Sequence, residues 1–121
     1  MTIINYIIGR WKSLTYACQG IWWLLKTESQ FKFHFGLAFL TCILGIYYNI
    51  SNTEWLVQTL IISFILSAEA LNTAVEKLAD FVEPKHNKSI GRIKDMGAAG
   101  VFIGVIAAIV IALIIYIPKI F

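Results

Sequence analysis

Three long apolar stretches dominate the pattern of hydrophobic and polar positions along this chain. They cover residues 33–50, 55–82 and 96–117, and the third contains no charged residue. As a helix, each stretch is long enough to cross a hydrocarbon layer of about 30 Å. The pattern therefore predicts an all-α membrane protein with three transmembrane helices, organised as a single domain over residues 1–121.

A different pattern precedes the first stretch. From Ile7 to Leu25 apolar residues recur alternately every four and every three positions. This spacing gathers them on one face of a helix, with polar residues such as Asn5 and Lys12 on the opposite face. We predict an amphipathic helix over about residues 3–27 that lies in the membrane interface. The same pattern is equally compatible with a helix packed against the transmembrane bundle.

The composition supports a membrane protein and narrows the possible partners. Hydrophobic residues make up 59% of the 121 residues and charged residues only 14%, and the mean hydropathy is +0.75. These values lie outside the usual range of soluble domains. The net charge of +3 follows membrane topology, so no nucleic-acid partner is predicted. Cys18 and Cys42 lie in apolar stretches without motif spacing and are interpreted as ordinary buried thiols.

The distribution of lysine and arginine predicts the orientation in the membrane. Positive charges gather in the N-terminal segment and between the second and third stretches, whereas the link over residues 51–54 has none. The positive-inside rule places the N-terminus and the second loop in the cytoplasm and the short link outside. Aromatic residues near the ends of the stretches are typical of membrane interfaces: Tyr47, Tyr48, Trp55 and Tyr116.

The second apolar stretch leads into a ladder of polar residues: Glu69, Asn72, Glu76 and Asp80. At about 100° per residue, all four fall within about 80° on one helical face. A carboxylate inside a transmembrane helix costs roughly 2.5–3.5 kcal/mol by insertion scales, so such a residue indicates a functional site. The ladder therefore predicts a site on this face.

The depth of the acids in the membrane suggests the kind of site. Counted from Trp55, Glu69 lies about 21 Å along the helix and Glu76 about 32 Å. Glu69 is therefore expected in the cytoplasmic leaflet, near the hydroxyl groups of lipid head groups. Glu76 and Asp80 are expected at the cytoplasmic interface, where nucleotides and magnesium are available. A face that connects a lipid hydroxyl with a cytosolic metal fits a lipid kinase.

Phosphoryl transfer requires a metal on the phosphates, a cation near the transferred group and a base near the attacking hydroxyl. Carboxylates suit Mg²⁺, and Glu28 and Glu76 are candidates. Lys94, beside Asp95, is a candidate phosphate-binding cation, and Glu69 is a candidate general base. The sequence contains no Walker loop and no protein-kinase or dinucleotide glycine pattern, so a nucleotide would bind without these standard phosphate cradles.

Each ladder residue also has a simpler explanation when it is taken alone. Glu69 would serve as a proton relay in a transporter, and Glu76 would form a structural salt bridge with a cation of the following loop. Asn72 is more often an interhelical hydrogen-bonding group. His34 is more often an interfacial hydrogen-bonding group than a ligand, and Asp80 more often a solvated charge. Only the set as a whole is moderately specific.

The combined motif resembles a known family. The stretch Glu69-Ala-Leu-Asn-Thr-Ala-Val-Glu76, followed by Lys94-Asp95-Met-Gly-Ala-Ala, is similar to the small integral-membrane diacylglycerol kinases of prokaryotes. That family includes the undecaprenol kinases. The resemblance extends over nearly the whole chain and includes Thr27-Glu28 near the N-terminus. It implies a three-span subunit with an N-terminal surface helix in the bacterial cytoplasmic membrane, assembled as a homotrimer with active sites between subunits.

The resemblance also implies an activity and the residues that perform it. The γ-phosphate of ATP would pass, with Mg²⁺ as cofactor, to the hydroxyl of diacylglycerol or undecaprenol. Glu69 matches the catalytic base, and Glu28 and Glu76 match the magnesium ligands. The nucleotide-contacting positions correspond to Tyr16, Glu28, Glu76, Lys85, His86, Asn87, Lys94 and Asp95. The positions that contact the lipid substrate correspond to Glu69, Asn72 and Ala98.

Some positions carry less of the resemblance. Arg10 lies one place out of register with the N-terminal arginine of the family, and roles for His34 and Asp80 are not assigned. Phe31, the Phe33-His34 pair and the Pro118-Lys119 ending resemble the undecaprenol-kinase branch more than the diacylglycerol branch. The resemblance thus leaves both lipids open as the substrate and slightly favours undecaprenol.

Two other classes of function compete with the kinase. A small proton- or cation-coupled transporter would use Glu69 as its relay, but this gives no reason for Glu28, Glu76 and Lys94 to gather at the cytoplasmic face. A non-catalytic scaffold would leave the acids unexplained. The spacing of Gly100 and Gly104 predicts close helix packing in the third span and says nothing about the number of subunits.

Overall fold

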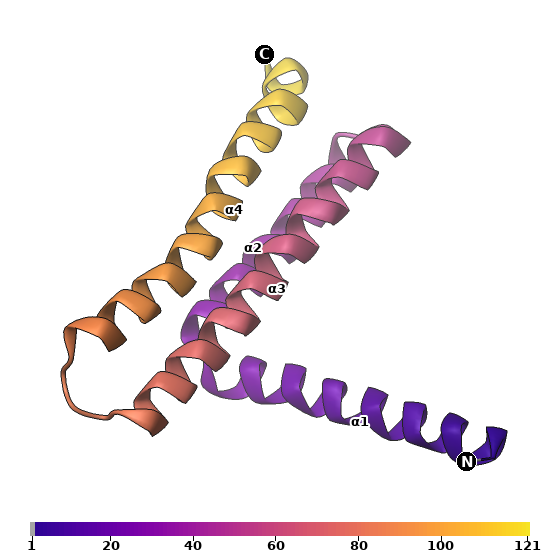
Figure 1. Cartoon of the computed structure of the whole chain (residues 1–121). Helices are drawn as coiled ribbons and strands as arrows, with labels where there is room; N and C mark the ends of the chain where they lie inside the picture. Colours follow the sequence, from indigo (N-terminus) through magenta and orange to yellow (C-terminus); the bar gives the residue numbers. More distant parts are fainter. Residues whose placement is uncertain (1) are drawn as a thin grey trace.

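The computed structural model describes residues 2–121, and these residues form four helices and no strand. The helices are α1 (Ile3–Thr27), α2 (Ser29–Tyr47), α3 (Asn52–Val82) and α4 (Lys88–Ile120). The last three are long and apolar enough to span a membrane, with mean hydropathies of 1.3, 1.4 and 3.0. The predicted all-helical architecture is thereby confirmed (Figure 1).

The helix ends differ from the predicted spans for local reasons. The structure ends α2 at Tyr47, because Asn49 has a left-handed backbone (φ 51°) and turns the chain toward α3. At the other end of the molecule α4 begins at Lys88, eight residues before the predicted span. The side chain of Asn87 accepts a hydrogen bond from the backbone N–H of Ser89 at 2.8 Å. This side-chain cap satisfies the first turn of α4.

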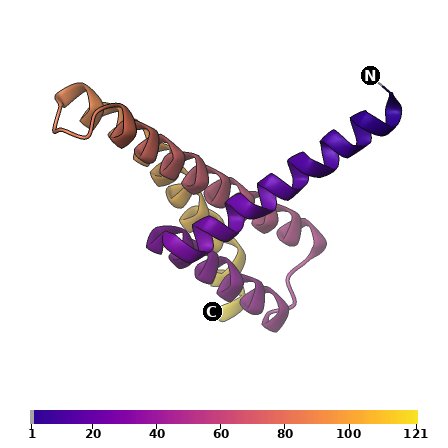
Figure 2. The same ribbon diagram turned by 90° about the horizontal axis from the view of Figure 1, so that it is seen from below.

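Helix α1 leaves the bundle instead of packing along it. Figures 1 and 2 show α2, α3 and α4 side by side, with α1 extending away from them at a large angle. No residue of α1 is buried, and its large apolar side chains, such as Trp11 and Trp22, are exposed. The side chain of Thr2 caps the helix by accepting a hydrogen bond from the Asn5 N–H. Its location in the membrane interface stays a prediction.

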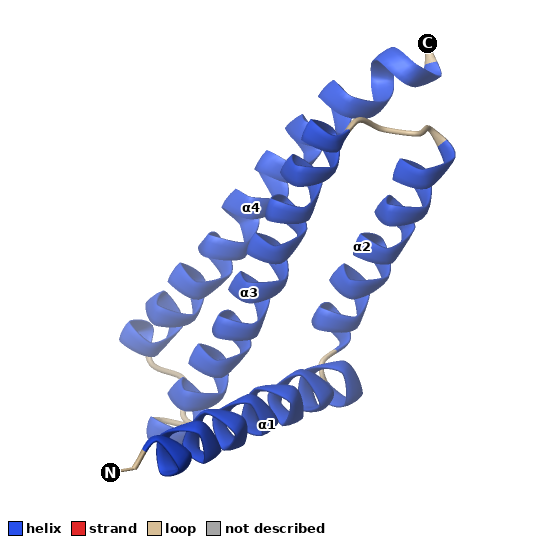
Figure 3. Cartoon of the chain, turned by 90° about the vertical axis from the view of Figure 1, so that its right-hand side faces the viewer, coloured by secondary structure: helices blue, strands red, loops and turns tan. Residues whose placement is uncertain are grey.

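Glycines let α4 approach α3 closely. The two helices lie against each other over most of their length, whereas α2 packs on α3 less extensively (Figure 3). A Cβ atom at Gly104 would lie 2.9 Å from the ring of Phe64, and one at Gly97 would lie 2.3 Å from the Asn72 side chain. Gly100 faces open space among the described residues. The close approach within the chain therefore uses Gly97 and Gly104, and a contribution of Gly100 to contacts between subunits stays a prediction.

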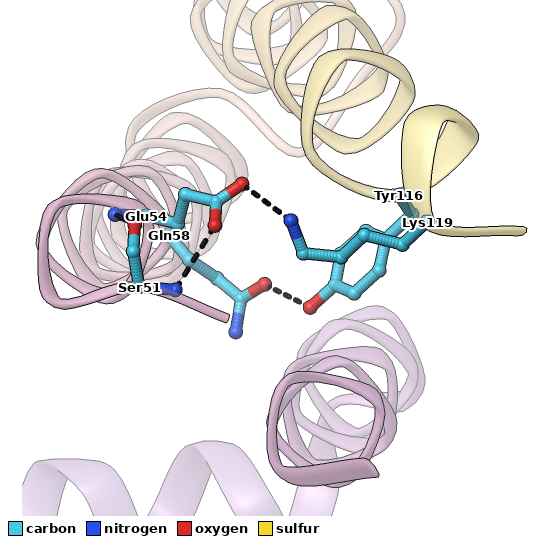
Figure 4. Close-up of polar contacts among 5 residues, drawn as sticks. All are labelled: Ser51, Glu54, Gln58, Tyr116 and Lys119. Carbon is cyan, nitrogen blue, oxygen red and sulfur yellow. Dashed lines mark hydrogen bonds and ion pairs between the residues drawn. The ribbon is translucent and has the colours of Figure 1, made fainter. Parts of the chain in front are cut away.

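Polar contacts join the helices at the end of the bundle that contains the α2–α3 turn (Figure 4). Lys119 donates to Glu54 at 3.1 Å, and the hydroxyl of Tyr116 donates to Oε1 of Gln58 at 2.6 Å. Tyr116 is only 7% exposed, so it is a buried bundle residue and not the interfacial aromatic that its position predicted. These contacts fix the position of α4 along the axis of α3.

Candidate functional site

Glu69, the deepest residue of the ladder, is enclosed between helices. The residue is 2% exposed, and its Oε2 atom lies 3.5 Å from Nε2 of His34 on α2. Thus two polar groups that the sequence places 35 positions apart meet because α2 and α3 run antiparallel. A buried carboxylate needs a polar partner, and His34 is that partner here.

One turn further along α3, Asn72 lies between Glu69 and Glu76 in the ladder and contacts Glu76. Its amide nitrogen donates to Oε1 of Glu76 at 3.3 Å, and Glu76 is half-buried. The amide oxygen of Asn72 is buried and lacks a hydrogen-bond partner within residues 2–121. It lies directly over Gly97 of α4. This unpaired acceptor is a group that a bound hydroxyl would satisfy.

Glu28 joins the same region from the junction of α1 and α2. Its Oε1 atom lies 2.9 Å from Nζ of Lys77, the residue that follows Glu76 on α3. This contact brings Glu28 alongside the turn that carries Glu76. The hydrogen bond from Lys77 holds the pKa of Glu28 below its ordinary value, against the opposing effect of desolvation. Glu28 is therefore ionised at neutral pH.

Beyond these acids, a polar hollow of about 250 Å³ lies where α3 passes into α4. Lys94 on α4 forms an ion pair with Asp80 on α3 across this hollow. The predicted nucleotide-contacting residues of the loop line it together with the pair, and the lining comprises Asp80, Glu83, Pro84, Lys85, His86, Asn87, Ile90, Gly91 and Lys94. The structure thus brings the predicted loop residues and Lys94 to one place.

Other predicted residues are not brought to this place within one chain. Tyr16 and Arg10 lie on α1, which extends away from the bundle (Figure 2). Tyr16 is 66% exposed, and the guanidinium of Arg10 packs over the ring of Tyr6 on the same helix. Asp95 and Ala98 lie on exposed positions of α4, flanking the buried approach of Gly97 to Asn72.

The carboxylates suit a magnesium ion that is completed by other ligands. Among residues 2–121, no three His, Cys, Asp or Glu side chains are grouped as a metal cage. Mg²⁺ commonly takes one or two carboxylates and completes its shell with phosphates and waters. Glu28 and Glu76 carry two such carboxylates, and the contact of Glu28 with Lys77 places it beside the helical turn of Glu76. The donor set therefore fits a magnesium ion bound together with a phosphate ligand.

Sequence reasoning missed the partners of several site residues. Lys77 was counted only as a positive charge, although it holds Glu28 against α3. The suggested pairing of Glu76 with a loop cation is wrong, because Glu76 accepts from Asn72 and Lys94 pairs with Asp80. On α2, His34 and the backbone carbonyl of Thr41 also contact α3, the first at Glu69 and the second at Gln58. These pairings depend on the register between helices, for which the sequence carries no local signal.

The structure has three helices of membrane-spanning length, with a buried acid, a paired amide and half-buried carboxylates toward one end of the bundle. These are features of a small integral-membrane lipid kinase. A model of the prokaryotic diacylglycerol kinase family matches residues 15–116. The chain belongs to this family, and the resemblance of its motif is confirmed.

Named relatives support the assignment. The chain is 35% identical over 108 residues to an undecaprenol kinase of Bacillus subtilis, with 89% of this chain and 88% of the relative covered. It is 30% identical over 91 residues to a diacylglycerol kinase of Haemophilus influenzae, covering 75% of this chain and 77% of the relative. A diacylglycerol kinase of Escherichia coli is 23% identical over 99 residues, covering 82% and 81%.

Proposed function

We propose that this protein transfers the γ-phosphate of ATP to the hydroxyl of a membrane lipid alcohol. The observation that carries the proposal is the position of Glu69, a buried acid on a membrane-spanning helix whose next two turns carry Asn72 and Glu76. A base at the level of lipid hydroxyls thus stands beside carboxylates that reach the aqueous phase. Family membership supports the same reaction class.

On the lipid side, Glu69 removes the proton from the attacking hydroxyl as general base. His34 holds the Glu69 carboxylate in place through the 3.5 Å contact. The unpaired amide oxygen of Asn72 is placed to accept a hydrogen bond from the substrate, and Ala98 borders this position on α4. Burial of Glu69 excludes water, which limits the competing hydrolysis of ATP.

On the nucleotide side, Glu28 and Glu76 would hold Mg²⁺. When bound, the ion neutralises charge on the phosphates and orients them. Lys94 supplies a cation for phosphate at the edge of the loop hollow, where it now pairs with Asp80. The remaining nucleotide contacts are assigned to Tyr16, Lys85, His86, Asn87 and Asp95. The concentration of Lys and Arg at this end of the bundle supports a cytoplasmic location for the N-terminus and the α3–α4 loop.

The direction of α1 supports sites that are shared between subunits, and the resemblance to the family implies that the assembly is a homotrimer. Tyr16 is exposed on a helix that leaves its own bundle, so it would contact nucleotide bound to a neighbouring subunit. The exposed apolar face of α1 would then rest in the membrane interface. In this arrangement Arg10 also lies near a neighbouring subunit, although its register with the family leaves its role unassigned.

The identity of the lipid substrate can be tested directly. The relatives include an undecaprenol kinase and diacylglycerol kinases, and the Pro118-Lys119 ending favours undecaprenol. We expect label from γ-labelled ATP to enter one of these two lipids when solubilised protein and magnesium are supplied. Glu69→Gln keeps the size of the side chain but removes its basicity, and it is expected to lose about 10²–10⁴-fold in kcat.

A matched control lies on the same helix. Glu54→Gln makes the same change at the opposite end of α3, where Glu54 pairs with Lys119, and it should retain turnover. Wild-type turnover in Glu69→Gln would remove Glu69 from the mechanism. If folded wild-type protein transferred label to neither lipid, proton flux in proteoliposomes without nucleotide would be measured, as the transporter hypothesis requires.

A further inference from the structure

A proton that reaches Glu69 has no direct route into water. The residue is 2% exposed, and it lies on a helix of membrane-spanning length. Phosphoryl transfer from ATP to an alcohol releases one proton near neutral pH, because neither the lipid phosphate nor ADP retains the hydrogen of the hydroxyl group. A general base that accepts this proton must lose it again before the next turnover. The proposed reaction therefore requires a second group that takes the proton from Glu69.

The next polar residue of the ladder does not provide such a group. Asn72 carries an amide, which donates and accepts hydrogen bonds but does not take up a proton near neutral pH. Its oxygen faces Gly97 of α4. Within residues 2–121, the hydrogen bond of the Asn72 side chain is with Glu76 and not with Glu69. A proton route along α3 is therefore interrupted at Asn72.

His34 on α2 has the properties of the required group. Its Nε2 atom lies 3.5 Å from Oε2 of Glu69, and its side chain is 18% exposed, against 3% for the side chain of Glu69. Imidazole changes its protonation state near neutral pH, so it accepts and releases protons readily. Contacts between catalytic groups are often long without substrate and shorten when the substrate binds. His34 thus contacts the buried acid and is itself more accessible.

The position of His34 along α2 gives a short path to the end of the bundle. His34 lies five residues after the start of α2 at Ser29, a rise of about 7.5 Å. Along α3, Glu69 lies 13 residues before the end of the helix at Val82, a rise of about 20 Å. The shorter path from the buried acid to water therefore leads through His34.

Few other ionisable groups surround His34. On α3 it faces Glu69, and this is its one ion pair within residues 2–121. Glu28, at the junction of α1 and α2, is paired with Lys77, and Glu76 lies two turns beyond Glu69. From α4, only aliphatic side chains line the cavity beside His34: Val105, Ala108, Ile109, Ile111 and Ala112. Glu69 is therefore the group that is placed to exchange a proton with His34.

We propose that His34 accepts the proton from Glu69 after each transfer and releases it to water. This inference rests on the proposed function and deepens it, because it assigns the step that restores the base. His34 acts only through Glu69 and does not touch the lipid or the nucleotide.

The relay conserves atoms and charge. The lipid hydroxyl gives its proton to the Glu69 carboxylate while its oxygen bonds to the γ-phosphorus, and the bond from the γ-phosphorus to the bridging oxygen of ADP breaks. Protonated Glu69 then transfers the proton to Nε2 of the neutral His34. The imidazolium loses one proton to water, which leaves the neutral ring and the Glu69 carboxylate ready for the next turnover.

Chemical rescue tests the relay. His34→Ala removes the ring and leaves space for a small molecule. It should lower kcat about tenfold, less than the loss of the base itself, and added imidazole should restore at least about half of the lost activity. Pyrazole has nearly the same shape but is a far weaker base, so it should not restore activity. Equal rescue by both compounds would show that the ring only fills space, and absence of rescue by imidazole would also count against the relay.

Two control variants test whether imidazole acts in place of His34. Leu37→Ala opens space one turn further along α2, beside the same cavity, but removes no base, so imidazole should not change its kcat. In Glu69→Gln the histidine is present and the base is absent, so imidazole should not restore activity. Acceleration of either variant would mean that imidazole acts on the substrate or elsewhere on the protein, and the relay would be rejected.

The pH dependence provides a second test. A cationic His34 cannot accept a proton from Glu69, so the wild-type kcat at saturating substrates should fall as the pH decreases from about 7 to 5. His34→Gln keeps a polar partner for Glu69 but has no imidazole. Its decrease should move to lower pH by at least about one unit, because a carboxylate titrates at lower pH than an imidazole. The same acidic decrease in both proteins would assign it to another group and contradict the relay.

The same experiments separate this inference from the proposed function. If wild-type protein transfers label to a lipid, but imidazole does not rescue His34→Ala and His34→Gln keeps the wild-type pH profile, the kinase stands and the relay fails. If folded wild-type protein transfers label to neither lipid, the proposed function fails and the relay fails with it.

Discussion

At the scale of single residues, the contact between His34 and Glu69 is the most specific feature of the site. Glu69 has one neighbour from another helix at 3.5 Å, and a base must be held within a fraction of an ångström to act efficiently. His34 is therefore proposed as a positioning residue, since it acts on the substrate only through Glu69.

His34→Ala should lower kcat by a smaller factor than the loss of Glu69 itself and should leave the KM for ATP unchanged. Replacement by glutamine restores a hydrogen-bonding group of similar reach, so His34→Gln should recover part of the loss. The check is a steady-state comparison of the two variants with the wild type. Equal kcat in His34→Ala and the wild type would show that the contact does not position the base.

A second prediction at this scale concerns Lys77. Its ammonium group lies 2.9 Å from a carboxylate oxygen of Glu28. A metal ion bound by Glu28 would need the space that this ammonium group occupies. Removing Lys77 should therefore strengthen metal binding. Ion pairs with exposed partners contribute about 1 kcal/mol or less. The dissociation constant of the metal should therefore fall by no more than about fivefold.

The measurement is a Mn²⁺ titration of solubilised protein in the absence of lipid, followed by the spectroscopic signal of the ion. Lys77→Ala should bind more tightly than the wild type, and Lys77→Arg, which keeps the charge, should not. Weaker binding in Lys77→Ala would mean that the lysine supports Glu28 as a ligand and does not compete for it.

At the scale of the elements, α3 and α4 form the most extensively packed helix pair of the molecule, because glycines allow them to approach closely. A Cβ atom at Gly97 would lie 2.3 Å from Asn72 Oδ1, whereas one at Gly100 would meet nothing within 4 Å among the described residues. Gly97→Ala and Gly100→Ala therefore make the same chemical change on one helix in opposite surroundings.

Gly97→Ala should destabilise the protein by about 1–3 kcal/mol through overpacking and should lower activity, because Asn72 must move away from Glu76. Gly100→Ala should be neutral or slightly stabilising, since alanine favours a helix by about 1 kcal/mol over glycine. Thermal unfolding in detergent and the kinase assay provide the comparison. Similar behaviour of the two variants would contradict the close approach at Gly97.

The same scale shows how far the sequence could predict this protein. Hydrophobic length predicted the membrane helices, and helical periodicity placed Glu69, Asn72 and Glu76 on one face, because both signals lie within a single element. The partners of those residues depend on how far one helix slides along another. Neither the Lys77–Glu28 contact nor the burial of Tyr116 produces a periodic pattern in the sequence, so both could be identified only from the structure.

At the scale of the whole molecule, the departure of α1 from the bundle predicts shared sites. If Tyr16 contacts nucleotide on a neighbouring subunit, then Tyr16→Ala and Glu69→Gln damage the same site from two different chains. Mixed assemblies of the two inactive variants should then regain part of the wild-type activity, because some sites receive neither change. The check is to unfold and refold the variants together and to compare them with the variants refolded separately.

Mixed assemblies that stay inactive would place all residues of one site on one chain. A control mixture of Glu69→Gln with Glu76→Ala, which both lie on α3, should not complement. Activity in that control would show that α3 itself is divided between sites.

The continuity of α3 has a consequence for how the two substrates travel. One uninterrupted helix runs from the membrane-embedded residue Gln58, past Glu69, to the polar hollow beyond Glu76. In the proposed arrangement a lipid approaches by diffusion within the plane of the bilayer, and a nucleotide approaches from the cytoplasm along the membrane normal. The two routes are perpendicular and meet over about two turns of helix. Neither molecule obstructs the arrival of the other, so binding in random order is expected, and each product leaves into the phase from which its parent came.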